Sequence, residues 1–172
     1  MKVILYMEIS ANGMIATKND DTSFISENAW KCFDEMTRKA GNIIVGKRTF
    51  DRDVKDGNFP YPDRLNVVMT NKKIKNKWGD NVIFTDKSPK EVLKLLEEKR
   101  FKIAFVGGGG KINASFLKEN LVDEVYFDVE PVLIGNGIKI SADEDFEIKM
   151  KLLETKIISE DEFQLHYKVL KN

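Results

Sequence analysis

A run of four glycines is the segment of this sequence best suited to hold an anion. Gly107, Gly108, Gly109 and Gly110 stand in succession between a short apolar run and a helical pattern. Residues without side chains leave the backbone open to close approach, and the free N–H groups of a helix start carry partial positive charge. We therefore predict that this run binds a phosphate group or a phosphorylated cofactor. A tight strand-to-helix turn is the alternative, but a turn accounts for one or two glycines and hardly for four.

The glycine run matches neither of two common nucleotide-binding motifs. When the dinucleotide motif G-x-G-x-x-G is counted from Gly108, Asn113 occupies the place of the third glycine. A Walker loop needs Ser or Thr after its lysine to hold magnesium, whereas Lys111 is followed by Ile112. The sequence therefore predicts an anion site without a bound metal.

A second candidate anion site is the segment Gly46, Lys47, Arg48 and Thr49. An apolar strand pattern ends on the glycine, and two cations and a hydroxyl follow at an expected helix start. The first turn of a helix usually favours acids, because the helix dipole is positive there. A bound anion would remove this conflict, so we predict that the segment contacts phosphate. A solvated basic turn is the alternative.

A third possible anion contact follows the apolar run at residues 65–70. Thr70, Asn71 and Lys72 place a hydroxyl, an amide and a cation together. Lysine-rich loops are often merely exposed to solvent, so this pattern gains weight only beside the other two segments.

Side chains for acid–base or nucleophilic catalysis are scarce. The chain has one histidine, His166, and one cysteine, Cys32. These numbers argue against a Ser-His-Asp triad and exclude a disulfide or a cysteine-based zinc site within the chain. His166 shares the polar side of a strand pattern with Gln164 and Lys168, which favours a structural or solvated role. The sequence identifies no catalytic residue and predicts no metal site.

The elements that must position these segments alternate between strand and helix patterns. Such alternation predicts an α/β fold with a mostly parallel sheet and flanking helices. The last third changes to long strand patterns joined by a polar turn at 159–161, which predicts an antiparallel C-terminal hairpin. Residues 10–22 are polar and rich in turn formers, and we expect a loop there. The expected strands cover 2–9, 42–45, 65–70, 82–85, 102–106, 124–133, 146–158 and 162–170, and the expected helices cover 26–39, a segment from 88 onward, and 111–120.

Local capping signals fix the ends of two of these helices. Ser26 is suited to cap the first helix, and Gly41 to end it in the left-handed conformation. Ser88, Pro89 and Glu91 have the spacing of a capping box with proline at the first helical position.

Composition indicates one soluble domain over residues 1–172. The chain holds 28 basic and 28 acidic residues, so its formal net charge is zero and it shows no sign of nucleic-acid binding. The hydrophobic content of 42% is sufficient for a core. The N-terminal apolar run stops at Glu8, too early for a signal peptide or a membrane span. We expect a cytoplasmic protein.

Four groups of motifs, in order along nearly the whole chain, resemble the dihydrofolate-reductase-like superfamily. The similarity is greatest to the C-terminal reductase domain of the bifunctional riboflavin deaminase–reductase. Residues 10–16 (SANGMIA) are similar to S-x-D-G-x-I-A, and residues 46–49 (GKRT) are similar to G-R-x-T. Residues 106–109 (VGGG) resemble I-G-G, and residues 121–125 and 130–137 resemble L-V-D-E-x and P-x-L-x-G-x-G.

The resemblance implies an NADPH-dependent reductase that forms a homodimer and acts on a small molecule. In the riboflavin enzyme, hydride reduces a ring-opened ribosylamino group to ribitylamino on a substrate that carries a 5′-phosphate. The cofactor positions implied are Ala11 and Ile15 at the nicotinamide, Gly46 to Thr49 at phosphates, Thr70 to Lys72 at the adenosine, and Val106 with Gly107 to Gly110 at the pyrophosphate. The substrate positions implied are Asn12, Trp30 and Phe33.

Three departures from the family pattern leave alternatives open. Asn12 stands where the family usually has Asp, and Thr70 stands where riboflavin reductases usually have an acid. No deaminase motif is present. Dihydrofolate reductase is one alternative, although Ala29 occupies the place of its pterin-binding acid and only Glu27 or Asp34 on a rotated helix could replace it. A nucleotide-binding protein without turnover is the other.

Overall fold

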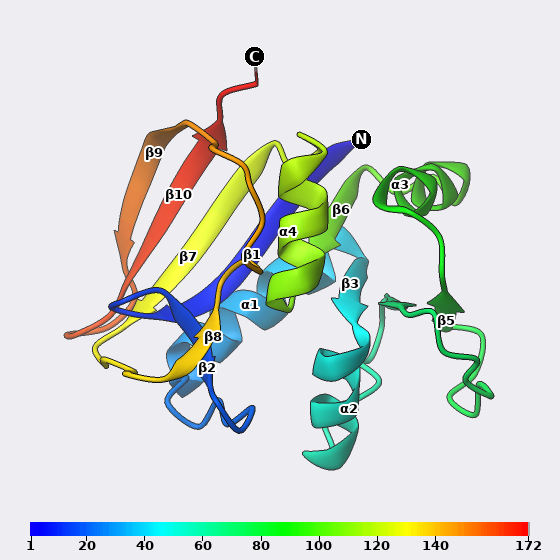
Figure 1. Cartoon of the computed structure of the whole chain (residues 1–172), viewed down its shortest axis with the longest axis horizontal. Helices are drawn as coiled ribbons and strands as arrows, with labels where there is room; N and C mark the ends of the chain where they lie inside the picture. Colours follow the sequence, from blue (N-terminus) through cyan, green and yellow to red (C-terminus); the bar gives the residue numbers. More distant parts are fainter. Residues whose placement is uncertain (172) are drawn as a thin grey trace.

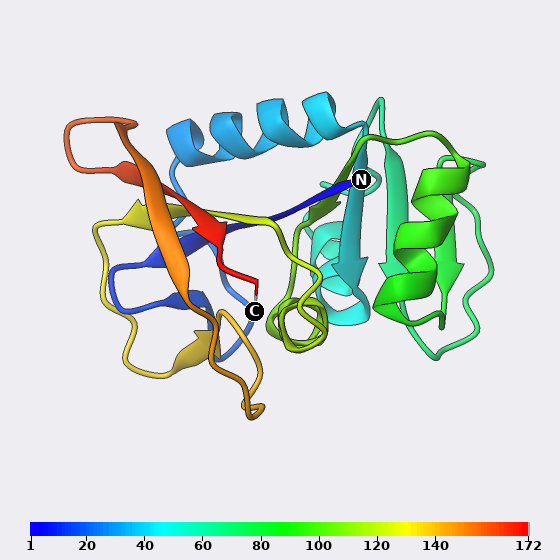
Figure 2. The same cartoon turned by 90° about the horizontal axis from the view of Figure 1, so that it is seen from above.

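An eight-stranded sheet with helices on both faces organises residues 1–171, the part of the chain that the computed structural model describes (Figures 1 and 2). Its strand order is β5-β4-β3-β6-β1-β7-β10-β9, with parallel pairing from β5 to β7 and antiparallel pairing from β7 through β10 to β9. This arrangement confirms the α/β class with a C-terminal hairpin. The strands are β1 (Lys2–Ser10), β3 (Asn42–Gly46), β4 (Leu65–Met69), β5 (Val82–Thr85), β6 (Ile103–Val106), β7 (Glu124–Glu130), β9 (Met150–Ile157) and β10 (Phe163–Val169).

Two apolar clusters hold the four helices against opposite faces of the sheet. On one face, Tyr6 of β1 and Phe105 of β6 pack with Phe33 of α1 (Glu27–Ala40), and Phe50 of α2 (Lys47–Lys55) belongs to the same cluster. The other face carries α3 (Pro89–Glu98) and α4 (Gly110–Lys118), which contribute Phe116 among other buried side chains. Burial of these side chains supplies the main favourable free energy of folding. No helix of residues 1–171 is long and apolar enough to cross a membrane.

The helix ends follow the capping signals where the sequence provides them. Ser26 accepts a hydrogen bond from the Ala29 N–H, Ser88 forms the capping box with Glu91, and Gly41 ends α1 with a φ of 72°. The helices α2 and α4 differ, because their N-caps are Gly46 and Gly109 and neither has a side-chain cap. Their free N–H groups therefore remain available to another partner.

The prediction of a continuous loop over residues 10–22 is wrong for part of its length. Residues Met14–Thr17 form β2, which pairs with β8 (Gly137–Lys139) in a separate two-stranded sheet. Ile15 and Ala16 are buried there. The partner strand β8 lies more than a hundred residues away in sequence. The prediction depended on the turn-forming residues nearby and therefore missed this pairing.

Other boundaries moved by a few residues. The strand expected at 146–158 begins only at Met150, and the helix expected at 111–120 runs from Gly110 to Lys118. The role expected for His166 agrees with its surroundings, since its ring stacks on Tyr126 and its Nε2 lies 3.2 Å from Glu124.

Candidate active site

A cavity of about 1330 Å³ opens at the carboxyl edge of the parallel strands. Its floor is formed where the strands end, by Met7 and Glu8 of β1, Gly46 of β3, Met69 of β4, and Gly107 after β6. Ligands of open α/β sheets bind outside the carboxyl ends of the strands, so the position of the cavity suits a ligand site. The small sheet formed by β2 and β8 contributes a further wall.

Most of the residues that the sequence proposed for a site line this one cavity. They come from five separate segments of the chain, which the fold brings to the same edge. The lining members of the proposed set are Ile15, Trp30, Phe33, Gly46, Lys47, Arg48, Thr49, Thr70, Asn71, Lys72, Gly107, Gly109 and Gly110.

Four residues of the proposed set do not line the cavity. Ala11 is exposed, and its N–H donates to the Val132 carbonyl. Val106 is fully buried in the core, and Gly108 turns toward Met7, whose Sδ would lie 2.9 Å from an added Cβ. The cofactor contacts proposed for Ala11, Val106 and Gly108 stay predictions, although none of the three lines the cavity.

Asn12, the fourth of these residues, joins two loops. Its side-chain amide donates to the Ile134 carbonyl at 2.9 Å, and its Oδ1 accepts from the Ile134 N–H at 3.1 Å and from the Ser10 hydroxyl at 2.8 Å. These bonds use both ends of the carboxamide to hold the chain at the start of β2. Motif position did not predict this structural role, and the substrate contact of Asn12 stays a prediction.

The two predicted anion segments meet in the cavity and form one site. Gly46 N–H donates to the carbonyl oxygen of Gly108 at 2.8 Å, so the start of α2 and the glycine run are bonded directly. A Cβ on Gly109 would lie 3.3 Å from Thr49 Oγ1 and 3.8 Å from Ile15 Cδ1. Two helix N-termini without side-chain caps therefore open side by side, and their dipoles favour the same bound anion.

Packing alone requires more of the glycines than we expected. Gly107 and Gly110 would place a Cβ 2.9 Å from Ile43 and 2.7 Å from the Lys139 carbonyl oxygen, respectively. Gly108 has a φ of +90°, which other L-residues rarely adopt. Gly109 is the least crowded of the four, although a Cβ there would still meet Thr49 Oγ1 at 3.3 Å, and it lines the cavity. The expectation that structure explains one or two of the four glycines was therefore too low.

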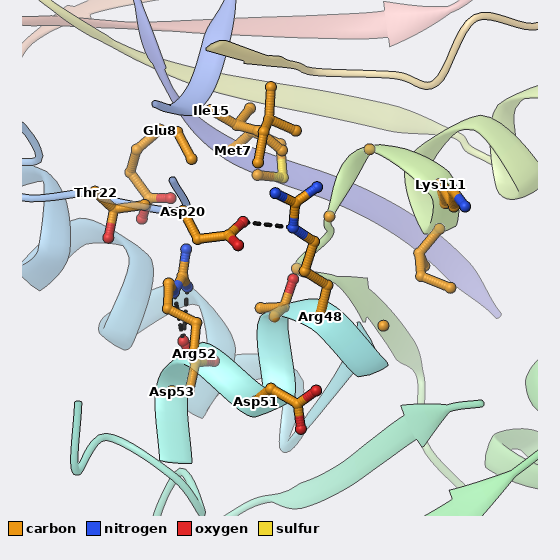
Figure 3. Close-up of a pocket in the computed structure, with 18 of the residues that line it drawn as sticks. Met7, Glu8, Ile15, Asp20, Thr22, Arg48, Asp51, Arg52, Asp53 and Lys111 are labelled. Atoms are coloured by element: carbon orange, nitrogen blue, oxygen red, sulfur yellow. Dashed lines mark hydrogen bonds and ion pairs between the residues drawn. The ribbon is translucent and has the colours of Figure 1, made fainter. Parts of the chain in front are cut away.

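Several of the cations in the cavity already have acidic partners. Arg48 Nε lies 2.6 Å from Asp20, and an Arg52 guanidinium nitrogen lies 2.6 Å from Asp53, as the dashed lines of Figure 3 mark. Lys47 is paired with Asp51 in the same helix. Within residues 1–171, Lys31, Lys72 and Lys111 line the cavity without an ion pair, whereas Lys139 is paired with Asp143. These three lysines are therefore the cations most available to an incoming anion.

An aromatic pair forms another wall. Trp30 stacks on Phe33 with 5.4 Å between ring centroids, and Tyr61 lies 6.2 Å from each of these rings. Trp30 remains 37% exposed although Phe33 is buried. A half-exposed indole that faces a cavity offers a surface for a planar ring.

Glu8 is the residue of this site that the sequence analysis missed. Its side chain lines the cavity but is only 5% exposed, and its Oε1 has no hydrogen-bond partner among the described residues. Burial raises the pKa of this carboxyl to about 8, and the acids Asp128 and Glu130 add to the shift while Arg52 opposes it. The available signal was the alternation of Ile4, Tyr6 and Glu8 on one face of an apolar strand.

Comparison with solved structures defines the class of fold. The dihydrofolate reductase of Enterococcus faecalis, solved with NADP(H) and an inhibitor, superposes with a TM-score of 0.76 at 16% identity over 99% of this chain and 97% of that one. A putative riboflavin biosynthesis protein from Shewanella gives a TM-score of 0.85 at 21% identity over 99% of this chain and all of the other. The fold is thus dihydrofolate-reductase-like.

Sequence comparison defines the family within that class. Residues 1–162 match the RibD C-terminal domain, and the chain belongs to this family. The uncharacterized protein YwjB of Bacillus subtilis is 26% identical over 96% of this chain and 97% of its own length. The 2,5-diamino-6-ribosylamino-4(3H)-pyrimidinone 5′-phosphate reductase of Aquifex aeolicus is 24% identical over 91% of this chain and 89% of its own. The family is one of reductases in riboflavin biosynthesis.

The raised pKa of Glu8 predicts a specific dependence of stability on pH. Between the ordinary glutamate value and about pH 8, the folded protein retains a proton that the unfolded chain has released. Stability from this group is therefore complete at low pH and is lost as the pH rises through the folded-state pKa. Relative to Glu8→Gln, the wild type should lose on the order of a few kcal/mol of unfolding free energy between pH 5 and pH 8.

Urea unfolding of both proteins across this pH range measures the effect. Glu35→Gln, which removes an exposed carboxylate from α1 outside the cavity, is the matched control and should follow the wild type. Parallel profiles for the wild type and Glu8→Gln would show that the carboxyl is not held neutral.

Proposed function

We propose that this protein is an NADPH-dependent reductase of a ribosylaminopyrimidine 5′-phosphate, similar to 5-amino-6-(5-phosphoribosylamino)uracil reductase. The observation that carries the proposal is the pair of helix N-termini, at Gly46 and Gly109, that open uncapped into one cavity. Membership of the reductase family supports it. NADPH would supply a hydride, and the chain would bind and orient both reactants.

The cofactor fits the cavity from the helix starts outward. The pyrophosphate would lie at the starts of α2 and α4, beside Thr49 and Gly109, where the backbone N–H groups have no side-chain cap. The adenosine end would extend to Thr70 and Lys72, at the end of β4. The nicotinamide would lie against Ile15, whose side chain adjoins Gly109.

The substrate would occupy the part of the cavity beside the aromatic wall. Trp30 and Phe33 offer a face for the pyrimidine ring, and Lys31 and Arg52, cations of the same cavity lining, are the proposed contacts for its phosphate. Arg52 would have to share its charge with Asp53, whereas Lys31 is exposed and free among residues 1–171. The aromatic rings would thus contact the pyrimidine of the substrate, and the cations would contact its phosphate.

Dihydrofolate reduction is the second candidate, and one observation favours it. The dihydrofolate reductase of Aedes albopictus is 26% identical over 73% of this chain. The helix carboxylates do not support it: Asp34 is paired with Arg64 and Arg38, and Ala29 is fully buried at the expected place of the acid. Glu27 does line the cavity without any rotation of the helix, contrary to our expectation, but it stands at an exposed rim.

Lys72 should determine the preference for NADPH over NADH. The two cofactors differ only in the phosphate on the adenosine ribose, and Lys72 is an unpaired cation at that end. Lys72→Ala should weaken NADPH binding about tenfold, the loss of one charge-assisted contact, and leave NADH binding unchanged. Fluorescence titration with both cofactors measures this difference.

Lys111→Ala is the matched control for this variant. Lys111 lies in the first turn of α4, beside the pyrophosphate that both cofactors share, so its removal should weaken NADPH and NADH equally. Equal affinity of the wild-type protein for the two cofactors would contradict the proposed preference.

Direct assays distinguish the candidate substrates. We expect turnover of a ribosylaminopyrimidine 5′-phosphate with NADPH to exceed that of dihydrofolate at least about a hundredfold in kcat/KM, because the first helix offers the pterin no buried acid. Efficient reduction of dihydrofolate would overturn the assignment. Cofactor binding without turnover of either compound would favour a binding protein.

We also propose a homodimer built on the C-terminal hairpin. β9 is an edge strand. Its Leu152 and Ile157 are 49% and 71% exposed, and they pair across the hairpin with Tyr167 and Phe163 of β10, respectively. An exposed edge that carries large apolar side chains is a template for pairing with a second chain.

Charges placed on this hairpin face should separate the dimer. The double variant Leu152→Lys and Ile157→Lys should sediment as a monomer at concentrations where the wild type is dimeric. Glu154→Lys, on the opposite side of the same strand, should remain dimeric. A wild type that is monomeric in analytical ultracentrifugation would refute the proposal.

A further inference from the structure

We propose that Glu8 is the general acid of this cavity: its carboxyl group gives a proton to the substrate nitrogen while hydride reaches the adjoining carbon. This assignment rests on the proposed reductase function and deepens it, because no catalytic residue was predicted from the sequence. The argument starts from where the side chain lies.

Glu8 lies near the carboxyl end of β1, one of the strands that form the cavity floor. The same cavity is lined by Ile15, proposed at the nicotinamide, and by Phe33, proposed at the pyrimidine. In Figure 3 the Glu8 side chain extends from β1 toward Thr22, Asp20 and Arg52. Glu8 therefore shares one cavity with the proposed positions of the hydride donor and of its acceptor.

The carboxyl group of Glu8 has a free position for a hydrogen bond. Its Oε1 is buried and unpartnered, whereas the other buried acids on this face are satisfied. Asp53 accepts from Arg52 and from the Tyr61 hydroxyl, Asp128 from Tyr6 and Gln164, and Glu130 from the Ser26 N–H. A buried polar atom without a partner costs free energy, and a ligand atom that supplied the bond would remove this cost.

Among residues 1–171, no other acid that lines the cavity is both buried and without a partner. Asp20, Asp51, Asp53 and Asp143 are paired with cations, and Glu27 and Asp56 are exposed at the rim. The single histidine, on β10, does not line the cavity.

The charges around Glu8 explain why it retains its proton. Asp128 and Glu130 on β7 disfavour the charged form, and Arg52 on α2 favours it. The charged form of Glu8 would also raise the pKa values of the Tyr6 and Tyr61 phenols, whose hydroxyl groups stay neutral. Burial outweighs Arg52, so the pKa of Glu8 rises to about 8.

The step balances with Glu8 as the acid. Carbon C1′ of the ring-opened substrate, part of a C=N bond, accepts the hydride and becomes a CH₂ group. The π electron pair of that bond moves to nitrogen, which forms an N–H bond with the Glu8 proton. The products are the ribitylamino compound, NADP⁺ and the Glu8 carboxylate, which then regains a proton from water.

Glu8→Gln tests this role, since glutamine keeps the size and a hydrogen-bond donor but transfers no proton. With the ribosylaminopyrimidine phosphate, kcat should fall about 10² to 10⁴-fold while the Kd for NADPH stays within about twofold of the wild type. Glu8→Asp should recover part of the loss, and Glu35→Gln on the outer surface of α1 should retain full activity. Circular dichroism confirms that each variant is folded.

Two pH titrations give readouts that a merely structural residue would not move. Because the protonated form is the active one, wild-type kcat should decline as the pH rises through about 8, and Glu8→Gln should lack this decline. In protein labelled with ¹³C at glutamate carboxyls, one resonance should titrate near pH 8 and be missing in Glu8→Gln. An ordinary glutamate titration for every carboxyl would overturn the proposal.

The outcomes separate this inference from the proposed function. An active wild type with an equally active Glu8→Gln would overturn the role of Glu8 and leave the reductase function standing. A wild type that turns over neither substrate would overturn the function and this step with it. Loss of kcat with retained NADPH binding and a missing alkaline limb supports both.

Discussion

The hydrogen bond from the Gly46 N–H to the Gly108 carbonyl oxygen, at 2.8 Å, is the contact on which the arrangement of the cavity depends. It extends the parallel pairing of β3 with β6 by one step beyond the strands themselves. α2 follows β3 at once, and α4 follows β6 after three glycines, so the bond fixes the starts of α2 and α4 beside each other. Because both helices begin on glycine, no side chain satisfies their first N–H groups, and the fold concentrates two positive dipole ends in one place.

Close packing and ligand access are served by the same glycine run. Gly107 and Gly110 allow the backbone to approach Ile43 and the Lys139 carbonyl, and this approach brings α4 down onto the sheet edge. Gly109 is the least crowded of the four, with Thr49 and Ile15 nearest to the place of its Cβ, and it lines the cavity. A structural turn and the proposed anion site are therefore compatible, because the glycines that packing requires lead directly to the uncapped start of α4.

Much of the fold could be predicted from the sequence because its determinants are local. The capping box at Ser88, the cap at Ser26 and the left-handed Gly41 each act within one turn of a helix, and apolar runs define the buried strands. The two-stranded sheet at Met14–Thr17 escaped prediction because its partner is distant. The structural role of Asn12 escaped prediction for a similar reason: its carboxamide bonds with Ile134, a contact that motif position alone does not reveal.

Glu8 shows a further limit of reading a sequence by pattern. A charged residue at the end of an apolar strand normally marks the point where the chain reaches solvent, and the sequence analysis used it in that way. In the structure β1 continues through Ile9 and Ser10 and pairs with β7 from Ile4 to Ser10, so Glu8 lies inside the sheet and is buried. A glutamine or an apolar side chain would remove the cost of burying this carboxyl. The acid thus lowers stability at neutral pH in the cavity where five chain segments bring the proposed dinucleotide site and an aromatic wall together. This is the pattern expected where a site, and not the core, determines the residue.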